Sequence, residues 1–190
     1  GIAHNLGKKH ASSFTEDQHT DTKVDFIMAN PPFNLKLNSQ GVTQDVLNGD
    51  PRWYGYSTPP VSNANYAWIL HMLSKLDVSN GIAGFLLANG ALNASGVELE
   101  IRKKLIENRK IEAIIVLPRE MFYSTDISVT LWIMNNNKGA RTLSGRQLRD
   151  RRDEVLFIDL RQWNTTIYEK KYVMLSDEQI AAVKKIYNDW

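Results

Sequence analysis

The chain has 190 residues, 43% of them hydrophobic and 23% charged, which is the composition of one folded domain and excludes wholesale disorder. Its formal net charge of +2 neither requires nor excludes a nucleic-acid partner. Cysteine is absent, which excludes disulfides and a cysteine nucleophile, and no apolar run approaches the ~20 residues of a membrane span, so we expect a cytoplasmic protein.

The first part of the chain predicts a polar loop, a short strand and a long loop. Residues 1–22 are polar and carry three histidines at irregular spacing, a pattern that favours a solvated loop over a metal site. Residues 24–29 form a mostly apolar run that stops before Pro31, which is typical of a buried strand. Residues 34–62 are rich in Asn, Ser, Gly and Pro, and structureless loops of this length are usually functional or disordered.

The rest of the chain alternates predicted strands and helices. Capping-box spacing occurs at Ser95 with Glu98 and at Ser176 with Gln179. Helical spacing of apolar residues predicts helices over residues 63–76, 95–108 and 176–190. Short apolar runs predict strands over residues 81–88, 111–117, 127–134 and 155–159. We therefore expect an α/β fold with a mainly parallel sheet and an antiparallel strand near one edge.

Residues 141–152 carry five arginines and leave two interpretations open. The segment is either a solvated connector, partly balanced by Asp150 and Asp153, or a patch that binds phosphate.

The tetrapeptide Asn30-Pro31-Pro32-Phe33 is the motif that carries chemistry, and it follows a predicted strand, where α/β folds place their sites. Neither proline has an N–H, so the loop is stiff and presents acceptors. The Asn30 side chain and the Pro31 carbonyl together can hold both hydrogens of an exocyclic amino group. Phe33 offers a flat face for a planar ring, so the motif suits a ring with an NH2 group, such as adenine. A proline turn with a buried Phe is the structural alternative.

At this point the sequence resembles a known family. Residues 25–34, Asp-Phe-Ile-Met-Ala-Asn-Pro-Pro-Phe-Asn, resemble the catalytic motif of amino-group DNA methyltransferases, and more narrowly that of the modification subunit of type I restriction-modification systems. The similarity continues in the family's order through residues 63–68, 84–90, 100–106, 117–118, 121–123 and 156–159. It therefore covers nearly the whole chain.

The resemblance implies a Rossmann-like S-adenosylmethionine-dependent methyltransferase fold. Residues 1–139 would form its target-base half, and residues 140–190 would add a basic connector, a strand and a terminal helix. The implied reaction is site-specific methylation of adenine N6 (EC 2.1.1.72), with the adenine flipped out of duplex DNA. The implied partners are DNA, a specificity subunit and a restriction subunit, and no metal is implied. The absence of cysteine excludes methylation of cytosine C5 in that superfamily.

The resemblance also assigns site residues. Asn30, Pro31, Pro32 and Phe33 would be catalytic, and Asn30 would also contact the cofactor S-adenosylmethionine. Tyr123 is a candidate for a second wall of the base pocket, with ordinary packing as the alternative. Further candidates, for contact with DNA phosphate, lie in loops expected on the same side, each with plain surface charge as the alternative: Lys36, Arg52 and Arg119.

The sequence departs from the family upstream of the motif. The 29 residues before Asn30 contain no Gly-rich cofactor turn and no acidic residue placed to hold the ribose, and Ser12 stands where an Asp is expected. We therefore expect a carboxyl-side fragment that is inactive alone. One alternative is a non-catalytic module that docks on a specificity subunit or self-associates through an exposed sheet edge at residues 24–28. A protein-glutamine methyltransferase is a third interpretation, against which Phe33 argues because Tyr is usual there.

Overall fold

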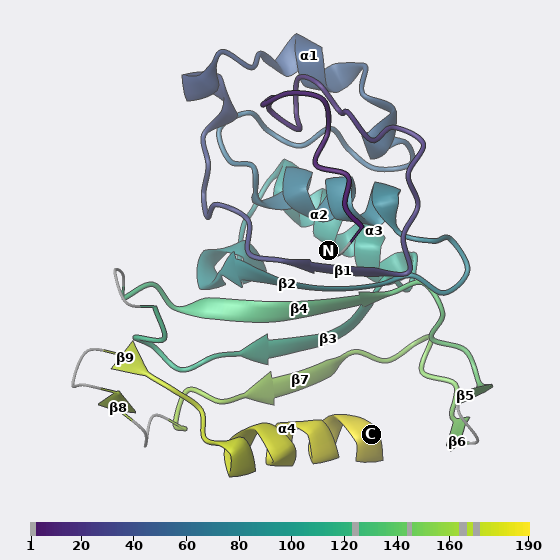
Figure 1. Cartoon of the computed structure of the whole chain (residues 1–190), viewed down its shortest axis with the longest axis vertical. Helices are drawn as coiled ribbons and strands as arrows, with labels where there is room; N and C mark the ends of the chain where they lie inside the picture. The colour runs from purple at the N-terminus through teal and green to yellow at the C-terminus, as the bar shows by residue number, and fades with distance from the viewer. Residues whose placement is uncertain (1–2, 123–125, 144–145, 164–166, 169–171) are drawn as a thin grey trace.

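The computed structural model describes the whole chain except residues 1–2, 123–125, 144–145, 164–166 and 169–171. Its main sheet has five strands in the order β1, β2, β4, β3, β7 (Figure 1). Their bounds are β1 Phe26–Ala29, β2 Ile82–Ala88, β3 Ile111–Val116, β4 Val129–Asn135 and β7 Leu156–Asp159. The predicted strands are therefore present, within one or two residues at their ends.

Four of these strands point the same way, and β4 alone among them is antiparallel to its neighbours β2 and β3. This confirms an α/β fold with a mostly parallel sheet. The antiparallel strand is central among the five strands of this chain, however, not near an edge as we expected. The connection over residues 117–128 forms no helix in its described part, so β4 returns beside β3 and fills the place next to β2.

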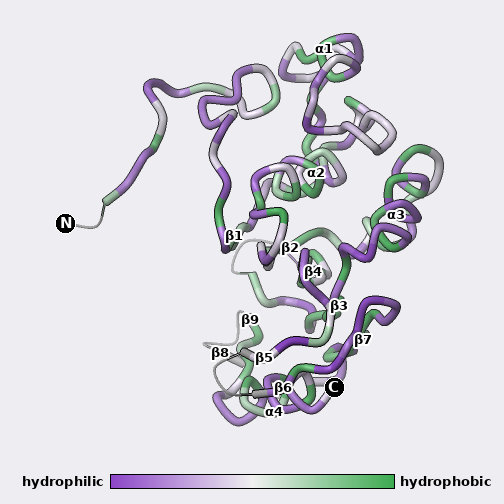
Figure 2. The backbone as a smooth tube through the Cα atoms, turned by 90° about the vertical axis from the view of Figure 1, so that its right-hand side faces the viewer, coloured by the Kyte–Doolittle hydropathy of each residue, from purple (hydrophilic) through white to green (hydrophobic). Residues whose placement is uncertain are grey.

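Helices lie on both faces of the sheet, as Figure 2 shows nearly edge-on. The helices α2 Asn65–Lys75 and α3 Val97–Glu107 cover one face. Alternate β2 residues, among them Phe85 and Leu87, point into this core, where Phe85 stacks on Trp132 with ring centroids 6.3 Å apart. The helix α4 Asp177–Asp189 packs on the opposite face, where Val183 contacts the smaller core around Ile158.

The two expected capping boxes have different outcomes. Ser176 accepts a hydrogen bond from Gln179 N and donates its own N–H to Gln179 Oε1, so the capping box of α4 is confirmed. The capping box at Ser95 is wrong, because α3 begins after Gly96 with no side-chain cap. Gly96 has a φ of +63°, a left-handed conformation that turns the chain after Ser95.

The long segment over residues 34–62 is folded, contrary to the expectation of a structureless loop. It contains the short helix α1 Gln44–Asn48 and two 3-10 turns, Leu37–Gln40 and Pro51–Trp53. Its apolar residues are too widely spaced to predict a helix, yet Leu37, Leu47 and Trp53 are all buried. They form part of the core beside α2, together with Phe14 of the amino-terminal segment.

Two short hairpins were not predicted, because their strands have only two or three residues. They are β5 Arg141–Leu143 with β6 Arg146–Leu148, and β8 Ile167–Tyr168 with β9 Tyr172–Val173. Near the first hairpin, the side chains of Arg149, Arg151 and Arg152 form ion pairs with Glu154, Glu112 and Asp150. These pairs favour the connector interpretation of residues 141–152 over a free phosphate-binding patch. Within the described residues, no helix is long and apolar enough to cross a membrane.

Candidate active site at the carboxyl end of the sheet

The tetrapeptide Asn30-Pro31-Pro32-Phe33 lies where β1 leaves the sheet. The parallel pairing of β1 with β2 places Ala29 in register with Phe85, so Asn30 leaves the sheet just before β2 reaches its own carboxyl end at Ala88. Pro31 is buried, whereas Asn30 is exposed and Phe33 is half-buried. The acceptors of the tetrapeptide thus stand at the carboxyl edge of the sheet, on a loop that the buried Pro31 anchors to the core.

Phe33 contacts an aromatic ring from a distant part of the sequence. The ring centroids of Phe33 and Phe122 lie 5.9 Å apart with an interplanar angle of 80°, an edge-to-face pair. Phe122 follows β3, which runs in the same direction as β1, so both loops leave the same edge of the sheet. Sequence reasoning chose Tyr123, which lies outside the described residues, and missed its neighbour Phe122. The position of Phe122 in the loop after a parallel strand is the feature of the sequence that could have identified it.

The residue after the tetrapeptide is held by the beginning of α2. Asn34 has a φ of +53°, in the left-handed region. Its backbone N–H donates to Asn65 Oδ1 at 3.0 Å, and its Oδ1 accepts from Asn65 Nδ2 at 2.9 Å. Asn65 is only 1% exposed. Sequence reasoning did not single out either asparagine.

The three predicted phosphate contacts lie in different environments. Arg52 is turned into the protein, where its guanidinium pairs with Asp50 and Nη1 lies 2.8 Å from His71 Nδ1. The positive charge that we expected at the DNA is therefore neutralised inside the fold, because the segment over residues 34–62 packs against α2. Arg119 and Lys36 are exposed; Arg119 Nε donates to Asp126 Oδ1 at 3.2 Å, and no ion pair joins Lys36 to a described residue.

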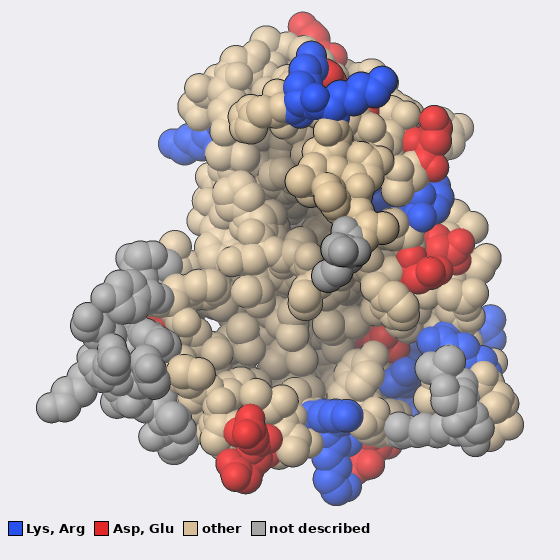
Figure 3. All heavy atoms as spheres, in the orientation of Figure 1, with Lys and Arg blue, Asp and Glu red and all other residues tan. Residues whose placement is uncertain are grey.

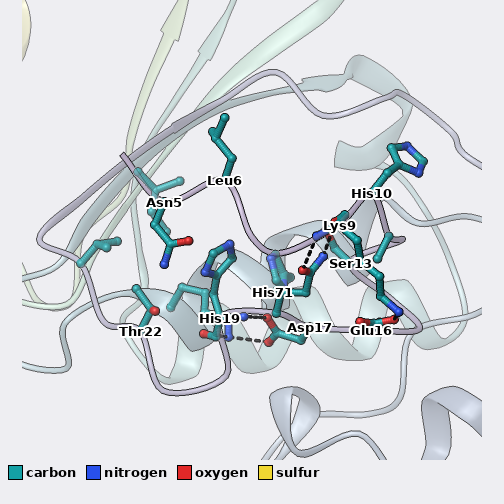
Figure 4. A pocket seen from close by; sticks show the side chains of 15 residues that line it. Asn5, Leu6, Lys9, His10, Ser13, Glu16, Asp17, His19, Thr22 and His71 are labelled. Carbon is teal, nitrogen blue, oxygen red and sulfur yellow. Dashed lines mark hydrogen bonds and ion pairs between the residues drawn. The ribbon is translucent and has the colours of Figure 1, made fainter. Parts of the chain in front are cut away.

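A cavity of about 290 Å³ lies beside the tetrapeptide, between β1 and α2, and Asn30 and Pro31 line it. A second cavity of about 510 Å³, under the amino-terminal segment, shares Ile27, His71 and Lys75 with the first (Figure 4). Burial, reinforced by the positive charge of Arg52, lowers the pKa of His71 to about 4, so its imidazole is neutral at pH 7.

The carboxylates of the second cavity are already paired. Burial by itself would raise the pKa of Asp17, but the hydrogen bonds from Lys75 and from the His19 N–H, together with the positive charges of Lys75 and Arg52, outweigh it and lower that pKa. Glu16 forms an ion pair with Lys9 at 3.0 Å. A ribose is usually held by a free carboxylate. Neither carboxylate of this cavity is therefore free to hold the ribose of S-adenosylmethionine.

The surface carries no single large basic patch on the face shown in Figure 3, where blue and red side chains are interspersed. The middle of this face, over the sheet, has neither. In the described part of the chain, no group of three or more His, Asp or Glu side chains is placed to hold a metal ion.

Comparison with known proteins places this geometry in a family. Residues 1–190 match the family model described as N-6 DNA Methylase. The chain is 44% identical over 163 residues to the type I restriction enzyme HindI methylase subunit of Haemophilus influenzae, covering 85% of this chain and 33% of that protein. It is 40% identical over 130 residues to the MjaIX methylase subunit of Methanocaldococcus jannaschii, covering 66% of this chain and 23% of that protein. The chain thus spans a third or less of these curated relatives.

Solved structures show the same fold. The methyltransferase subunit of a type I restriction-modification system from Streptococcus thermophilus superposes with a TM-score of 0.75 at 28% identity, over 94% of this chain and 34% of that one. The type I restriction enzyme EcoKI M protein superposes with a TM-score of 0.62 at 16% identity, over 93% of this chain and 33% of that one. The second likeness concerns the fold alone.

Proposed function

Because the chain belongs to the N-6 DNA methylase family, we propose that it is part of the modification subunit of a type I restriction-modification system and methylates adenine N6 in DNA. One observation supports this most: Asn30-Pro31-Pro32-Phe33 stands at the carboxyl edge of the sheet, with Phe33 against Phe122. The activity corresponds to a site-specific adenine DNA methyltransferase, EC 2.1.1.72.

The residues of this chain would act on the amino group. Asn30 Oδ1 and the Pro31 carbonyl accept hydrogen bonds from the two N6 hydrogens, which leaves the nitrogen lone pair free to attack. Phe33 stacks on the flipped adenine, and Phe122 forms a second wall. S-adenosylmethionine, when bound, supplies the methyl group. Catalysis in this scheme comes from orientation and hydrogen bonding, without a covalent enzyme intermediate.

This chain contributes only part of the DNA-binding surface, and partner subunits contribute the rest. Lys36 and Arg119, both exposed, contact phosphates near the flipped base, and phosphate replaces Asp126 as the partner of Arg119. Arg52 does not contact DNA, because its side chain is buried and paired with Asp50. A specificity subunit reads the DNA sequence, and a restriction subunit completes the complex. The interspersed charges of Figure 3 support a subunit that relies on such partners for affinity.

The test is a methylation assay on the subunit as encoded, assembled with its partner subunits. Radiolabelled S-adenosylmethionine and duplex DNA are supplied, and the modified nucleoside is identified by mass spectrometry. We expect N6-methyladenine. N4-methylcytosine as the product, or methylated glutamine in protein with unmodified DNA, would overturn the proposal.

The segment of residues 1–190 is proposed to be inactive by itself. It has no Gly-rich turn before Asn30, and the acids of the cavity under its amino-terminal segment are paired. Calorimetry of this segment with S-adenosylmethionine should give no specific heat of binding. Binding with micromolar affinity would contradict this part of the proposal and leave the assignment of the reaction untouched.

A further inference from the structure

The loop that carries Asn30-Pro31-Pro32-Phe33 is held at both of its ends. At the first end, Ala29 is still in the β1–β2 ladder, in register with Phe85. Inside the loop, the proline rings fix φ at Pro31 and Pro32. A following proline also biases Asn30 and Pro31 toward extended ψ, so the remaining backbone freedom is ψ at Pro32 and both dihedral angles at Phe33 and Asn34. What fixes Asn34 therefore restrains where the Phe33 ring points and holds the far end of the segment that carries the Pro31 carbonyl.

Asn34 is fixed by a reciprocal pair of hydrogen bonds with one buried side chain. Asn65 Oδ1 accepts the Asn34 N–H at 3.0 Å, and Asn65 Nδ2 donates to Asn34 Oδ1 at 2.9 Å. Both ends of the Asn65 amide are thus used on a single residue. Asn34 Oδ1 also accepts a longer hydrogen bond from Asn63 Nδ2, at 3.4 Å. Because Asn65 is 1% exposed, its own amide has no ready access to water if either bond to Asn34 is lost.

Asn65 is itself held in place. Its backbone N–H donates to Asn63 Oδ1 at 2.9 Å, which orients the first turn of α2. Next to it, the Ala64 N–H donates to the Leu35 carbonyl at 2.8 Å. The two ends of the segment between Leu35 and Asn63 therefore lie side by side. The Asn34–Asn65 hydrogen bonds join these two ends directly after the tetrapeptide.

We propose that Asn65 is a positioning residue for methyl transfer, which holds the tetrapeptide in its base-accepting geometry through Asn34. The inference rests on the proposed function. Asn65 does not touch the substrate in this scheme, so its loss should lower kcat by disturbing the orientation of the acceptors. It should leave the affinity for the cofactor unchanged, because Asn30 follows directly on the β1–β2 ladder, which Asn65 does not touch.

The experiment compares Asn65→Ala with Asn135→Ala in the encoded subunit with its partners. Asn135 is 2% exposed and donates to Glu112 at 2.8 Å, so both variants lose a buried amide hydrogen bond, but Asn135 lies at the opposite end of the sheet. We expect Asn65→Ala to lower kcat at least tenfold at saturating DNA and S-adenosylmethionine, with the Kd of the cofactor within twofold of the unaltered enzyme. Asn135→Ala should keep kcat within twofold.

A second pair of variants keeps the inference testable if Asn65→Ala does not fold. Asn34 is exposed, so its substitution spares the core. Asn34→Asp keeps the acceptor and tolerates a positive φ, and it should retain kcat within threefold. Asn34→Ala removes the acceptor, and its kcat should fall at least tenfold. An equal kcat for these two, or an unchanged kcat in Asn65→Ala, would overturn the inference, whereas an unaltered enzyme that never methylates adenine would overturn the proposed function.

Discussion

The rings of Phe33 and Phe122 lie edge to face, 5.9 Å between centroids, although one follows β1 and the other follows β3. The contact spans the sheet edge at which β1, β2 and β3 all end. A flat base entering between these loops would meet aromatic surface from both.

Phe33→Ala and Phe122→Ala should each weaken the hold on the flipped adenine. Stacking of a base on an aromatic ring is worth about 1–3 kcal/mol, so we expect kcat/KM to fall roughly 5- to 150-fold in each variant. Fluorescence of 2-aminopurine at the target position reports the flipped base directly. Phe157→Ala is the matched control, because that ring is 69% exposed on β7 and lies away from the site. Similar losses in all three variants would contradict the assignment.

Asn30→Ala should abolish methyl transfer without unfolding the protein. Asn30 is exposed, and substitutions at exposed positions usually change stability by less than about 0.5 kcal/mol. The variant loses the side-chain acceptor for the amino group, so we expect kcat to fall at least about 100-fold. Asn30→Asp keeps an acceptor and should recover part of the rate. A thermal unfolding curve that matches the unaltered protein establishes that the loss is chemical.

Arg52→Ala should affect folding, not DNA binding. The side chains of Arg52 and Asp50 are 8% and 11% exposed, and breaking such a pair by removing one partner costs about 3–5 kcal/mol. Lys36→Ala should leave stability unchanged and weaken DNA binding. The slope of log affinity against log salt concentration should fall by about one, as expected for one lost phosphate contact. Denaturant titration and DNA binding at several salt concentrations separate the two effects. A large loss of DNA affinity in a stably folded Arg52→Ala protein would contradict this prediction.

His71 should make the fold sensitive to mild acid. Its pKa is about 4 in the folded protein against an ordinary value of 6.5, because burial and Arg52 disfavour the imidazolium. Between these values the unfolded chain binds more protons, so stability should fall as pH drops from 6.5 toward 4. The nearby Asp17 and Asp50 have lowered pKa values and titrate below this window.

The slope of the unfolding free energy against pH measures this effect. We expect a loss approaching about 1.4 kcal/mol per pH unit within the window. His71→Gln keeps an acceptor for Arg52 and should flatten the dependence of the unfolding free energy on pH. Equal slopes for the two proteins would show that His71 is not responsible.

The segment of residues 1–190 should self-associate through β1. This strand is the edge of the described sheet, and Phe26 and Met28 are 77% and 96% exposed on it. An open apolar edge is a template for pairing with another chain. Met28→Lys should shift sedimentation toward monomer, whereas Val78→Lys, at a residue 73% exposed outside the sheet, should not. A clean monomer for the unaltered segment at high concentration would contradict the prediction.

The α/β class and the position of the tetrapeptide after a strand could both be predicted from residue order. Apolar runs and helical periodicity are local properties, so β1, β2, α2 and the motif at Asn30 could be located from residue order alone. The stiff, acceptor-rich chemistry of Asn30-Pro31-Pro32-Phe33 is likewise a property of the residues themselves.

The residues that surround the motif could not be predicted in this way, because they come from distant parts of the chain. Phe122 reaches Phe33, Asn65 reaches Asn34 and Arg52 turns inward to Asp50, and each outcome depends on strand order or on how the segment over residues 34–62 packs. The central place of β4 corrected the expectation of an antiparallel strand near an edge, because a short connection predicts a neighbour for β3 but not which strand lies on the other side. These are contacts between residues far apart in the chain, and local spacing carries no information about them.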